Sequence, residues 1–204
     1  MIVELQNALN SITVLEAVAV AAGLLYLILA VYESILCWLF SLISVSIYFY
    51  IFIDTELWAE VLLQIYYLGT TAYGFYTWRY GSVKSNVEQG RKPILRASVK
   101  KHSIFMGIIL VGTLIGGYCL EEFTAEKWPY LDSFTTVGAL VTTWMVTQKY
   151  LENWLYWIVV DSAGVLLMYK SGLFLTALLF VVYLVIVVFG FYNWKNLCRE
   201  QITL

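Results

Sequence analysis

The chain has 204 residues, of which 61% are hydrophobic and 13% are charged, and its formal net charge is −2. Its mean hydropathy of +0.79 is higher than ordinary soluble domains of this length show, so a soluble globular fold is excluded. The composition therefore predicts a membrane protein.

Seven long apolar runs follow one another along the chain. Each is close to the roughly 20 residues that a helix needs to cross about 30 Å of hydrocarbon. A helix satisfies its own backbone polar groups in lipid, so helices are the expected spanning elements. We therefore predict an all-α polytopic membrane protein with seven transmembrane helices. The predicted spans are 13–32, 35–53, 57–78, 103–120, 131–148, 153–170 and 173–194.

The N-terminal residues carry no basic stretch, and no small-residue cleavage site follows the first apolar run, so we expect the first span to be retained. Cys37, Cys119 and Cys198 are odd in number and lack metal-ligand spacing, which argues against a disulfide framework or a zinc site. The single His102 cannot build a metal or haem cluster. The sequence thus predicts neither a metal nor a cofactor.

One long polar segment, 79–102, carries seven basic residues and one acid, Glu88. By the positive-inside rule this loop is cytoplasmic, which places the N-terminus outside and the C-terminus in the cytoplasm. All Lys and Arg residues except Lys127 and Lys170 then lie on the cytoplasmic side. We interpret the basic loop as a topology signal that is attracted to anionic lipid, and not as a nucleic-acid interface.

An internal repeat organises the spans. Residues 57–78 align without a gap onto 173–194 at an offset of 116, with nine of 22 positions identical, and Trp38 pairs with Trp154 at the same offset. We predict two parallel three-helix repeats, 13–78 and 131–194, joined by a basic loop and connector helix at 79–130. Parallel repeats of this kind are a carrier architecture, found in the SWEET sugar transporters, with substrate bound near mid-membrane between the halves.

Asp161 is an ionisable residue in the middle of an apolar span. A carboxylate there costs roughly 2.5–3.5 kcal/mol on an insertion scale, so it is a functional hypothesis by default. The alternative is an ion pair or a protonated carboxyl, but no Lys, Arg or His lies at comparable depth in another span. Trp157 sits one helical turn away, and an aromatic face beside a carboxylate suits an organic cation. The two residues together predict a cationic substrate.

Other polar residues share helical faces within the spans. The Gln64 amide could recognise a heteroaromatic edge or a hydroxyl, or it could bond a neighbouring helix. Asp132 at the outer end of its span is interpreted as a helix cap. The predicted substrate-binding residues are Asp161, Trp157, Gln64, Tyr67, Ser44, Tyr48 and Thr136.

Three stretches resemble the Pnu-type vitamin transporters, which carry nicotinamide riboside or thiamine: 132–136 (DSFTT), 149–161 (KYLENWLYWIVVD) and 73–78 (YGFYTW). The resemblance implies a SWEET-like seven-helix fold and facilitated diffusion of a phosphate-free vitamin, trapped by a cytoplasmic kinase. It is closest to the thiamine-type members, because nicotinamide riboside carriers have asparagine at the positions of Ser44 and Asp161.

We therefore predict a thiamine transporter of a bacterial inner membrane, working by facilitated diffusion and alternating access. A nicotinamide riboside carrier of the same family and a proton-coupled carrier with Asp161 as the titrating group are the alternatives. A retinal protein would need a lysine deep in the last span, and 174–193 contains none. A membrane enzyme is disfavoured, because no nucleophile–base pair lies within the spans. The sequence leaves a homo-oligomer open.

Overall fold

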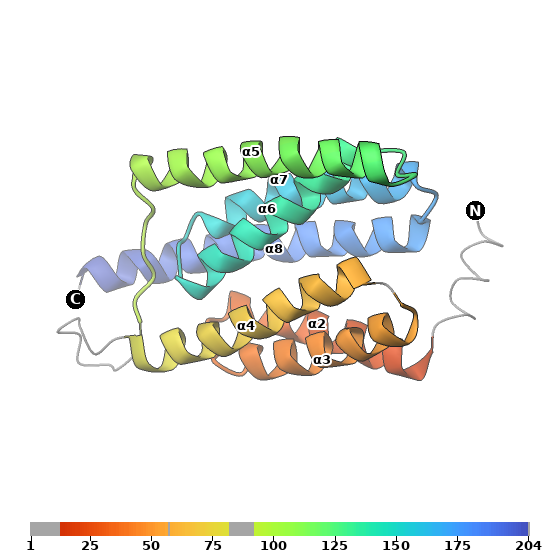
Figure 1. Ribbon diagram of the computed structural model, residues 1–204. Helices are drawn as coiled ribbons and strands as arrows, with labels where there is room; N and C mark the ends of the chain where they lie inside the picture. The colour runs from red at the N-terminus through yellow and green to blue at the C-terminus, as the bar shows by residue number, and fades with distance from the viewer. Residues whose placement is uncertain (1–12, 57, 82–91, 204) are drawn as a thin grey trace.

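The computed structural model describes residues 13–56, 58–81 and 92–203. Seven α-helices form a bundle in this part of the chain, which confirms the all-α, seven-helix prediction (Figure 1). In chain order they are α2 (Val14–Val31), α3 (Cys37–Asp54), α4 (Trp58–Tyr80), α5 (Val99–Phe123), α6 (Pro129–Thr147), α7 (Asn153–Lys170) and α8 (Phe174–Thr203).

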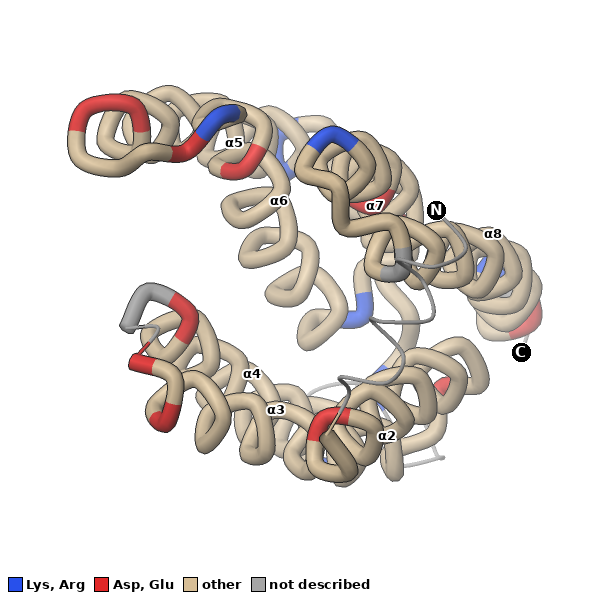
Figure 2. The backbone as a smooth tube through the Cα atoms, turned by 90° about the vertical axis from the view of Figure 1, so that its right-hand side faces the viewer, with Lys and Arg blue, Asp and Glu red and all other residues tan. Residues whose placement is uncertain are grey.

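Successive helices run in opposite directions, so their connections gather at two ends of the bundle (Figure 1). We call one end the basic end: it holds the α2–α3, α4–α5 and α6–α7 connections and the last turns of α8. Its segment 92–101 contains Lys92, Arg96, Lys100 and Lys101. We call the other the acidic end, onto which Figure 2 looks. It carries Asp54, Glu56, Glu121, Glu122 and Glu126.

The helices pack as two groups. In the first, α3 contacts both α2 and α4; in the second, α7 contacts both α6 and α8. The groups meet where α2 contacts α8 and where α4 contacts α6, while α5 packs on α6 (Figures 1 and 2). The space enclosed by the first group, α6 and α7 is therefore where a substrate could lie between the halves.

Two helices, α5 and α8, extend several residues beyond the apolar runs that predicted them. α5 begins at Val99, because the Ser98 hydroxyl caps it by accepting a hydrogen bond from the Lys101 backbone N–H at 3.4 Å. α8 continues to Thr203, because no Gly or Pro follows Trp194 to stop it. At 30 residues it is about 45 Å long, so its last turns extend past the apolar core at the basic end.

The helices differ in hydropathy, and the difference follows from what each helix contacts. Among the described residues, four helical segments are long and apolar enough to cross a membrane by length and composition: Val14–Val31, Cys37–Asp54, Val99–Phe123 and Thr176–Gln201. α4, α6 and α7 are more polar because they carry buried side chains such as Gln64, Thr143 and Asp161. These three helices surround the space between the two groups, so their polarity is directed inward.

Four tryptophans pack together at the basic end, and we call Trp38, Trp78, Trp154 and Trp194 the tryptophan cluster. All four are at most 2% exposed. The Trp38 and Trp78 rings meet edge to face at 5.3 Å and 87°, and Trp154 and Trp194 do so at 5.3 Å and 86°. The two pairs touch through Trp78 and Trp194, whose ring centroids lie 5.8 Å apart. Residues 116 apart thus make the same contact twice.

Glycines make room for this cluster. A Cβ at Gly74 would lie 2.2 Å from Trp38, and one at Gly190 would lie 2.6 Å from Trp154. Since Gly74 and Gly190 are again 116 apart, each half has a glycine at the same repeat position, and the missing side chain leaves space for the tryptophan ring.

Hydrogen bonds at the basic end also repeat at this offset, and they run between the halves. The Trp78 indole N–H donates to the Val146 carbonyl, and the Trp194 indole N–H donates to the Ala30 carbonyl. Thr77 likewise donates to the Thr147 carbonyl, and Asn193 donates to the Val31 carbonyl. The division into 13–78, 79–130 and 131–194 stays a prediction, and these matched contacts support it.

Glu33 and Lys149 are the charged residues of this interface. They occupy the same repeat position, both have positive φ angles of 55° and 57°, and their side chains form an ion pair. The Lys149 ammonium also donates to the Lys92 carbonyl and lies 4.5 Å from the centre of the Trp78 ring. In the predicted two-fold arrangement of the repeats, equivalent positions meet only on the axis, and the contact between Glu33 and Lys149 agrees with this expectation.

Candidate functional site

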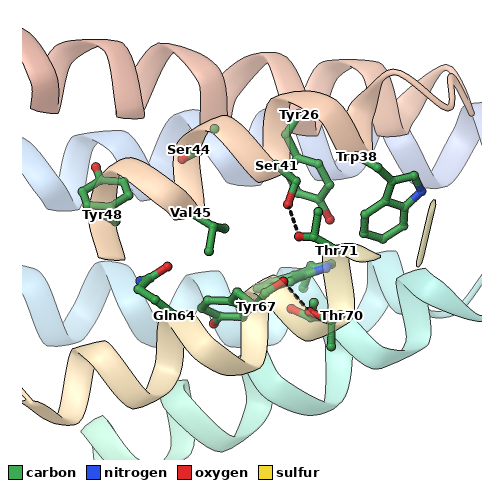
Figure 3. A pocket seen from close by; sticks show the side chains of 13 residues that line it. Tyr26, Trp38, Ser41, Ser44, Val45, Tyr48, Gln64, Tyr67, Thr70 and Thr71 are labelled. Atoms are coloured by element: carbon green, nitrogen blue, oxygen red, sulfur yellow. Dashed lines mark hydrogen bonds between the residues drawn. The ribbon is translucent and has the colours of Figure 1, made fainter. Parts of the chain in front are cut away.

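A cavity of about 280 Å³ lies between the first helix group and helices α6 and α7, near the lower limit for small-molecule sites. The side chains that line it come from α2, α3, α4, α6 and α7, and many are polar (Figure 3). They are Gly23, Tyr26, Trp38, Ser41, Ser44, Val45, Tyr48, Gln64, Tyr67, Thr70, Thr71, Thr143 and Trp157.

The structure brings five of the seven predicted site residues to this cavity. Ser44 and Tyr48 reach it from α3, Gln64 and Tyr67 from α4, and Trp157 from α7. Figure 3 shows the side chains of α3 facing those of α4 across it. Helical spacing had put these residues on shared faces, and the packing of α3 on α4 turns those faces toward each other. Their role in binding stays a prediction.

Asp161 and Thr136 are not among the residues that line the cavity. Thr136 lies on α6, two turns before the lining residue Thr143. Asp161 lies one turn beyond Trp157 on α7 and is 3% exposed. Within the described part of the chain its carboxylate has no hydrogen bond or ion pair, whereas Tyr183 of α8 lies within electrostatic range of both Asp161 and Tyr48. The carboxylate is thus buried on α7 outside the cavity lining.

Several lining residues were missed by sequence reasoning. Ser41, Thr71 and Thr143 stand on the polar stripes that contain Ser44, Tyr67 and Thr136, so the stripes carried the signal. Tyr26 had no such signal, because it is an isolated polar residue in the most apolar span. Its ring packs against Trp38, with centroids 6.0 Å apart, and this contact directs it to the cavity.

The lining polar groups fall into two sets. In the first, bonds within the protein are already made: Ser41 and Thr71 share a hydrogen bond of 2.7 Å, and Ser44 donates to the Ala19 carbonyl at 2.9 Å. In the second, the side chains make no hydrogen bond to any described residue: they belong to Tyr26, Trp38, Tyr48, Gln64, Tyr67, Thr143 and Trp157. Because polar groups at buried positions are normally paired, this second set is available to a ligand.

Charge in the lining is as informative as hydrogen bonding. Among the described residues that line the cavity, none is Lys, Arg or His. Carboxylates stand one turn from the lining on two helices: Glu60 on α4, which acts electrostatically on the lining residue Tyr67, and Asp161 on α7, one turn beyond Trp157. In a medium of low dielectric constant such a carboxylate attracts cations and repels anions over several ångströms. The arrangement suits a cation with polar edges and disfavours a phosphate.

The cavity ends at the tryptophan cluster. Trp38 lines it on one side and packs against Trp78 on the other, and the Glu33–Lys149 ion pair lies beyond. The buried indole N–H of Trp38 has no partner among the described residues. The basic end is therefore closed by packed side chains.

Comparisons with known proteins agree with a carrier. The family model described as nicotinamide mononucleotide transporter matches residues 13–196. The nicotinamide riboside transporter PnuC of Escherichia coli is 26% identical, over 92% of this chain and 87% of that protein. PnuC of Neisseria mucosa is 28% identical, over 92% of this chain and 74% of that protein. The riboflavin/roseoflavin transporter RibM of Streptomyces davaonensis is 24% identical, over 84% and 80%.

A solved structure is also similar. The crystal structure of the vitamin B3 transporter PnuC superposes with a TM-score of 0.68 and 28% identity, covering 91% of this chain and 82% of that one. The predicted resemblance to Pnu-type transporters is confirmed, and a transporter is favoured over an enzyme. The chain is a multi-pass membrane protein that belongs to the nicotinamide mononucleotide transporter family.

Proposed function

We propose that this chain carries nicotinamide riboside, without a phosphate group, across a bacterial inner membrane. Relatives from Escherichia coli and Neisseria mucosa bear the name of that activity. The observation that carries the proposal is the lining of the cavity, which holds several unpaired polar groups and no Lys, Arg or His among its described residues. A phosphorylated mononucleotide would bring two negative charges into this lining without a cationic partner.

The chemistry of the cargo fits the cavity. Nicotinamide riboside has a positively charged pyridinium ring, a carboxamide and ribose hydroxyls. The Trp157 face and the Asp161 field would stabilise the ring, and the Gln64 amide would pair with the carboxamide. The hydroxyl groups of Tyr48, Tyr67 and Thr143 would serve the ribose.

Thiamine is the second candidate, and one observation favours it. Its thiazolium is also a permanent cation, and Asp161 with Ser44 is the combination that resembles thiamine-type members. Since both vitamins carry one positive charge, Asp161 alone does not separate them. The names of the relatives from Escherichia coli and Neisseria mucosa support nicotinamide riboside as the first candidate.

Transport would follow from rocking of 13–78 against 131–194, with the basic end in the cytoplasm. Opening that end must break the Trp78–Val146 and Trp194–Ala30 hydrogen bonds and separate Glu33 from Lys149. No energy source is needed if a cytoplasmic kinase phosphorylates the vitamin, because the product no longer fits the cavity.

Equilibrium binding to the purified protein tests the cargo. We expect nicotinamide riboside to bind more tightly than thiamine, and nicotinamide mononucleotide to bind at least about 100-fold more weakly than the riboside, as the penalty for an unpaired phosphate. Tight binding of the mononucleotide would overturn the proposal, and a preference for thiamine would promote the second candidate.

Uptake into liposomes tests the absence of coupling. Under an imposed pH gradient, we expect nicotinamide riboside to equilibrate without accumulating. Accumulation that collapses with the gradient would instead support a proton-coupled carrier with Asp161 as the titrating group.

A further inference from the structure

A second cavity, of about 200 Å³, lies at the basic end, and we call it the α8 cavity. It opens between the segment that precedes α5, the connection between α6 and α7, and the last turns of α8. These turns belong to the part of α8 that extends past the apolar core. The cavity is lined by Arg96, Leu151, Phe191, Lys195, Cys198 and Arg199.

The charges in this cavity have one sign. Arg96, Lys195 and Arg199 line it, and none of its described lining residues is acidic. Glu152 approaches Arg96 at 3.5 Å, but its other carboxylate oxygen accepts a hydrogen bond from the Ala97 backbone N–H at 2.8 Å. The cavity therefore gathers positive charge from two segments that are far apart in the sequence, which favours an anionic ligand.

The remaining lining is apolar. Leu151 and Cys198 are buried, and the Lys195 ammonium lies over the Phe191 ring, 5.8 Å from the ring centre. A soluble anion gains nothing from such a wall. A phospholipid presents both surfaces at once, since its phosphate sits above acyl chains at the membrane boundary.

The α8 cavity is linked through the α6–α7 connection to the closed basic end, where the cavity between the helix groups stops. Leu151 belongs to the same connection as Lys149, and both are tied to the segment before α5. The Leu95 N–H donates to the Lys149 carbonyl at 2.8 Å, and the Leu151 N–H donates to the Leu95 carbonyl at 2.8 Å. A ligand that bridges Arg96 and α8 would hold this connection against α8.

We propose that the α8 cavity binds the phosphate headgroup of an anionic phospholipid and thereby stabilises the closed basic end. The site is separate from the substrate cavity, and the proposal does not depend on which vitamin is carried.

Thermal unfolding in neutral detergent tests the proposal. Added phosphatidylglycerol should raise the Tm of the protein by more than the same amount of phosphatidylcholine does. The double variant Lys195→Gln/Arg199→Gln should lose at least half of this difference. The matched control Arg79→Gln/Lys100→Gln removes two exposed cations outside the cavity, and it should keep the difference. Equal responses of the two double variants would overturn the proposal.

A second readout does not depend on unfolding. In a Cys119→Ser background, which lacks the exposed thiol, phosphatidylglycerol should slow maleimide labelling of Cys198 at least about threefold, because Cys198 lines the cavity. Inorganic phosphate should neither slow the labelling nor raise the Tm. If phosphate alone produced both effects, the site would be one for a soluble anion, and the lipid assignment would be wrong.

Discussion

The basic end and the candidate substrate cavity between the helix groups differ in how far the two halves of the molecule match. At the basic end, residues 116 apart make the same contacts: Trp78 and Trp194 donate to Val146 and Ala30, which are themselves 116 apart. Around the cavity the same offset pairs mostly unlike residues, with Trp38/Trp154 and Tyr67/Tyr183 as identical pairs. The closed end is thus built from duplicated packing, whereas the cavity is built from the differences between the halves.

Three pairs show how these differences act. Ser41 of α3 corresponds to Trp157 of α7, and both line the cavity. Val45 corresponds to Asp161, so only the second half has a carboxylate at that depth. Gln64 corresponds to Phe180. The Phe180 ring packs so closely on Gly164 that a Cβ at Gly164 would lie 2.4 Å from it.

We therefore expect the residues that differ between the halves to determine which substrate is recognised. A duplicated scaffold places equivalent faces on both sides of the substrate, but a vitamin with one cationic ring and one ribose has no such symmetry. Under the proposed function, the unlike cavity residues would let one half face the ring and the other half face the polar edges. At the basic end, by contrast, the matched residues make the contacts by which each half packs on the other.

Breaking the ion pair at the axis should have the largest effect. Lys149 has 2% of its side chain exposed and Glu33 has 16%. Glu33→Gln would leave the Lys149 charge buried without its carboxylate, which typically costs about 3–5 kcal/mol of stability. The measurement is the free energy of unfolding in detergent. Because the predicted repeat makes the two positions equivalent, the exchange Glu33→Lys/Lys149→Glu should recover much of the lost free energy of unfolding. If the exchange lost as much stability as Glu33→Gln alone, the two positions would not have equivalent surroundings.

The glycines of the tryptophan cluster should give the next largest effect. Gly74→Ala and Gly190→Ala each force a methyl group into an indole ring, and such overpacking costs about 1–3 kcal/mol. Thermal unfolding should show similar losses for both variants. Gly69→Ala is the control, because no atom lies within 4 Å of its Cβ position, and it should leave the Tm unchanged or raise it. A large loss in one half only would argue against duplicated packing.

Making the cavity more symmetric should weaken binding without harming the fold. Gln64→Phe gives α4 the residue that α8 has at the matching position, so it removes an unpaired amide and fills part of the cavity. We expect about a tenfold loss of affinity for nicotinamide riboside, or about 1.4 kcal/mol, with the Tm kept. Titration calorimetry checks this. Unchanged affinity would remove Gln64 from the site.

The polar bonds between the halves should give the smallest effect. Thr77→Val and Asn193→Leu each remove one donor to a carbonyl of the other half. A single neutral hydrogen bond contributes about 1 kcal/mol, so both variants should lose stability by that amount, and to a similar extent. Denaturant unfolding of the pair is the test, with a severalfold difference between them as the contradicting result.

The sequence predicted the helices well, because apolar length decides which segments span a membrane. It missed the extension of α8, since a helix can continue into water where hydropathy has fallen. The repeat was visible in Gly74 and Gly190, but their function of seating Trp38 and Trp154 required the packing between helices.

The site was harder to predict. Helical spacing placed Gln64 with Tyr67 and Ser44 with Tyr48, and the structure brings both faces to the cavity. It also placed Asp161 on the face of Trp157, yet Asp161 is not among the lining residues, because helical spacing does not predict how far a cavity extends along a helix. The Glu33–Lys149 pair was missed, although two opposite charges at one repeat position carried the signal.

We expect Asp161, which corresponds to Val45 in the first half, to make the cavity select a cation. Nicotinamide riboside and its 1,4-dihydro form have nearly the same shape, but only the former has a charged ring, so titrating both into the protein and into Asp161→Asn isolates the charge. The protein should bind the cation at least about tenfold more tightly, and the variant should lose this preference while keeping its affinity for the neutral form. The same preference in both proteins, or none in the unmodified protein, would contradict the account.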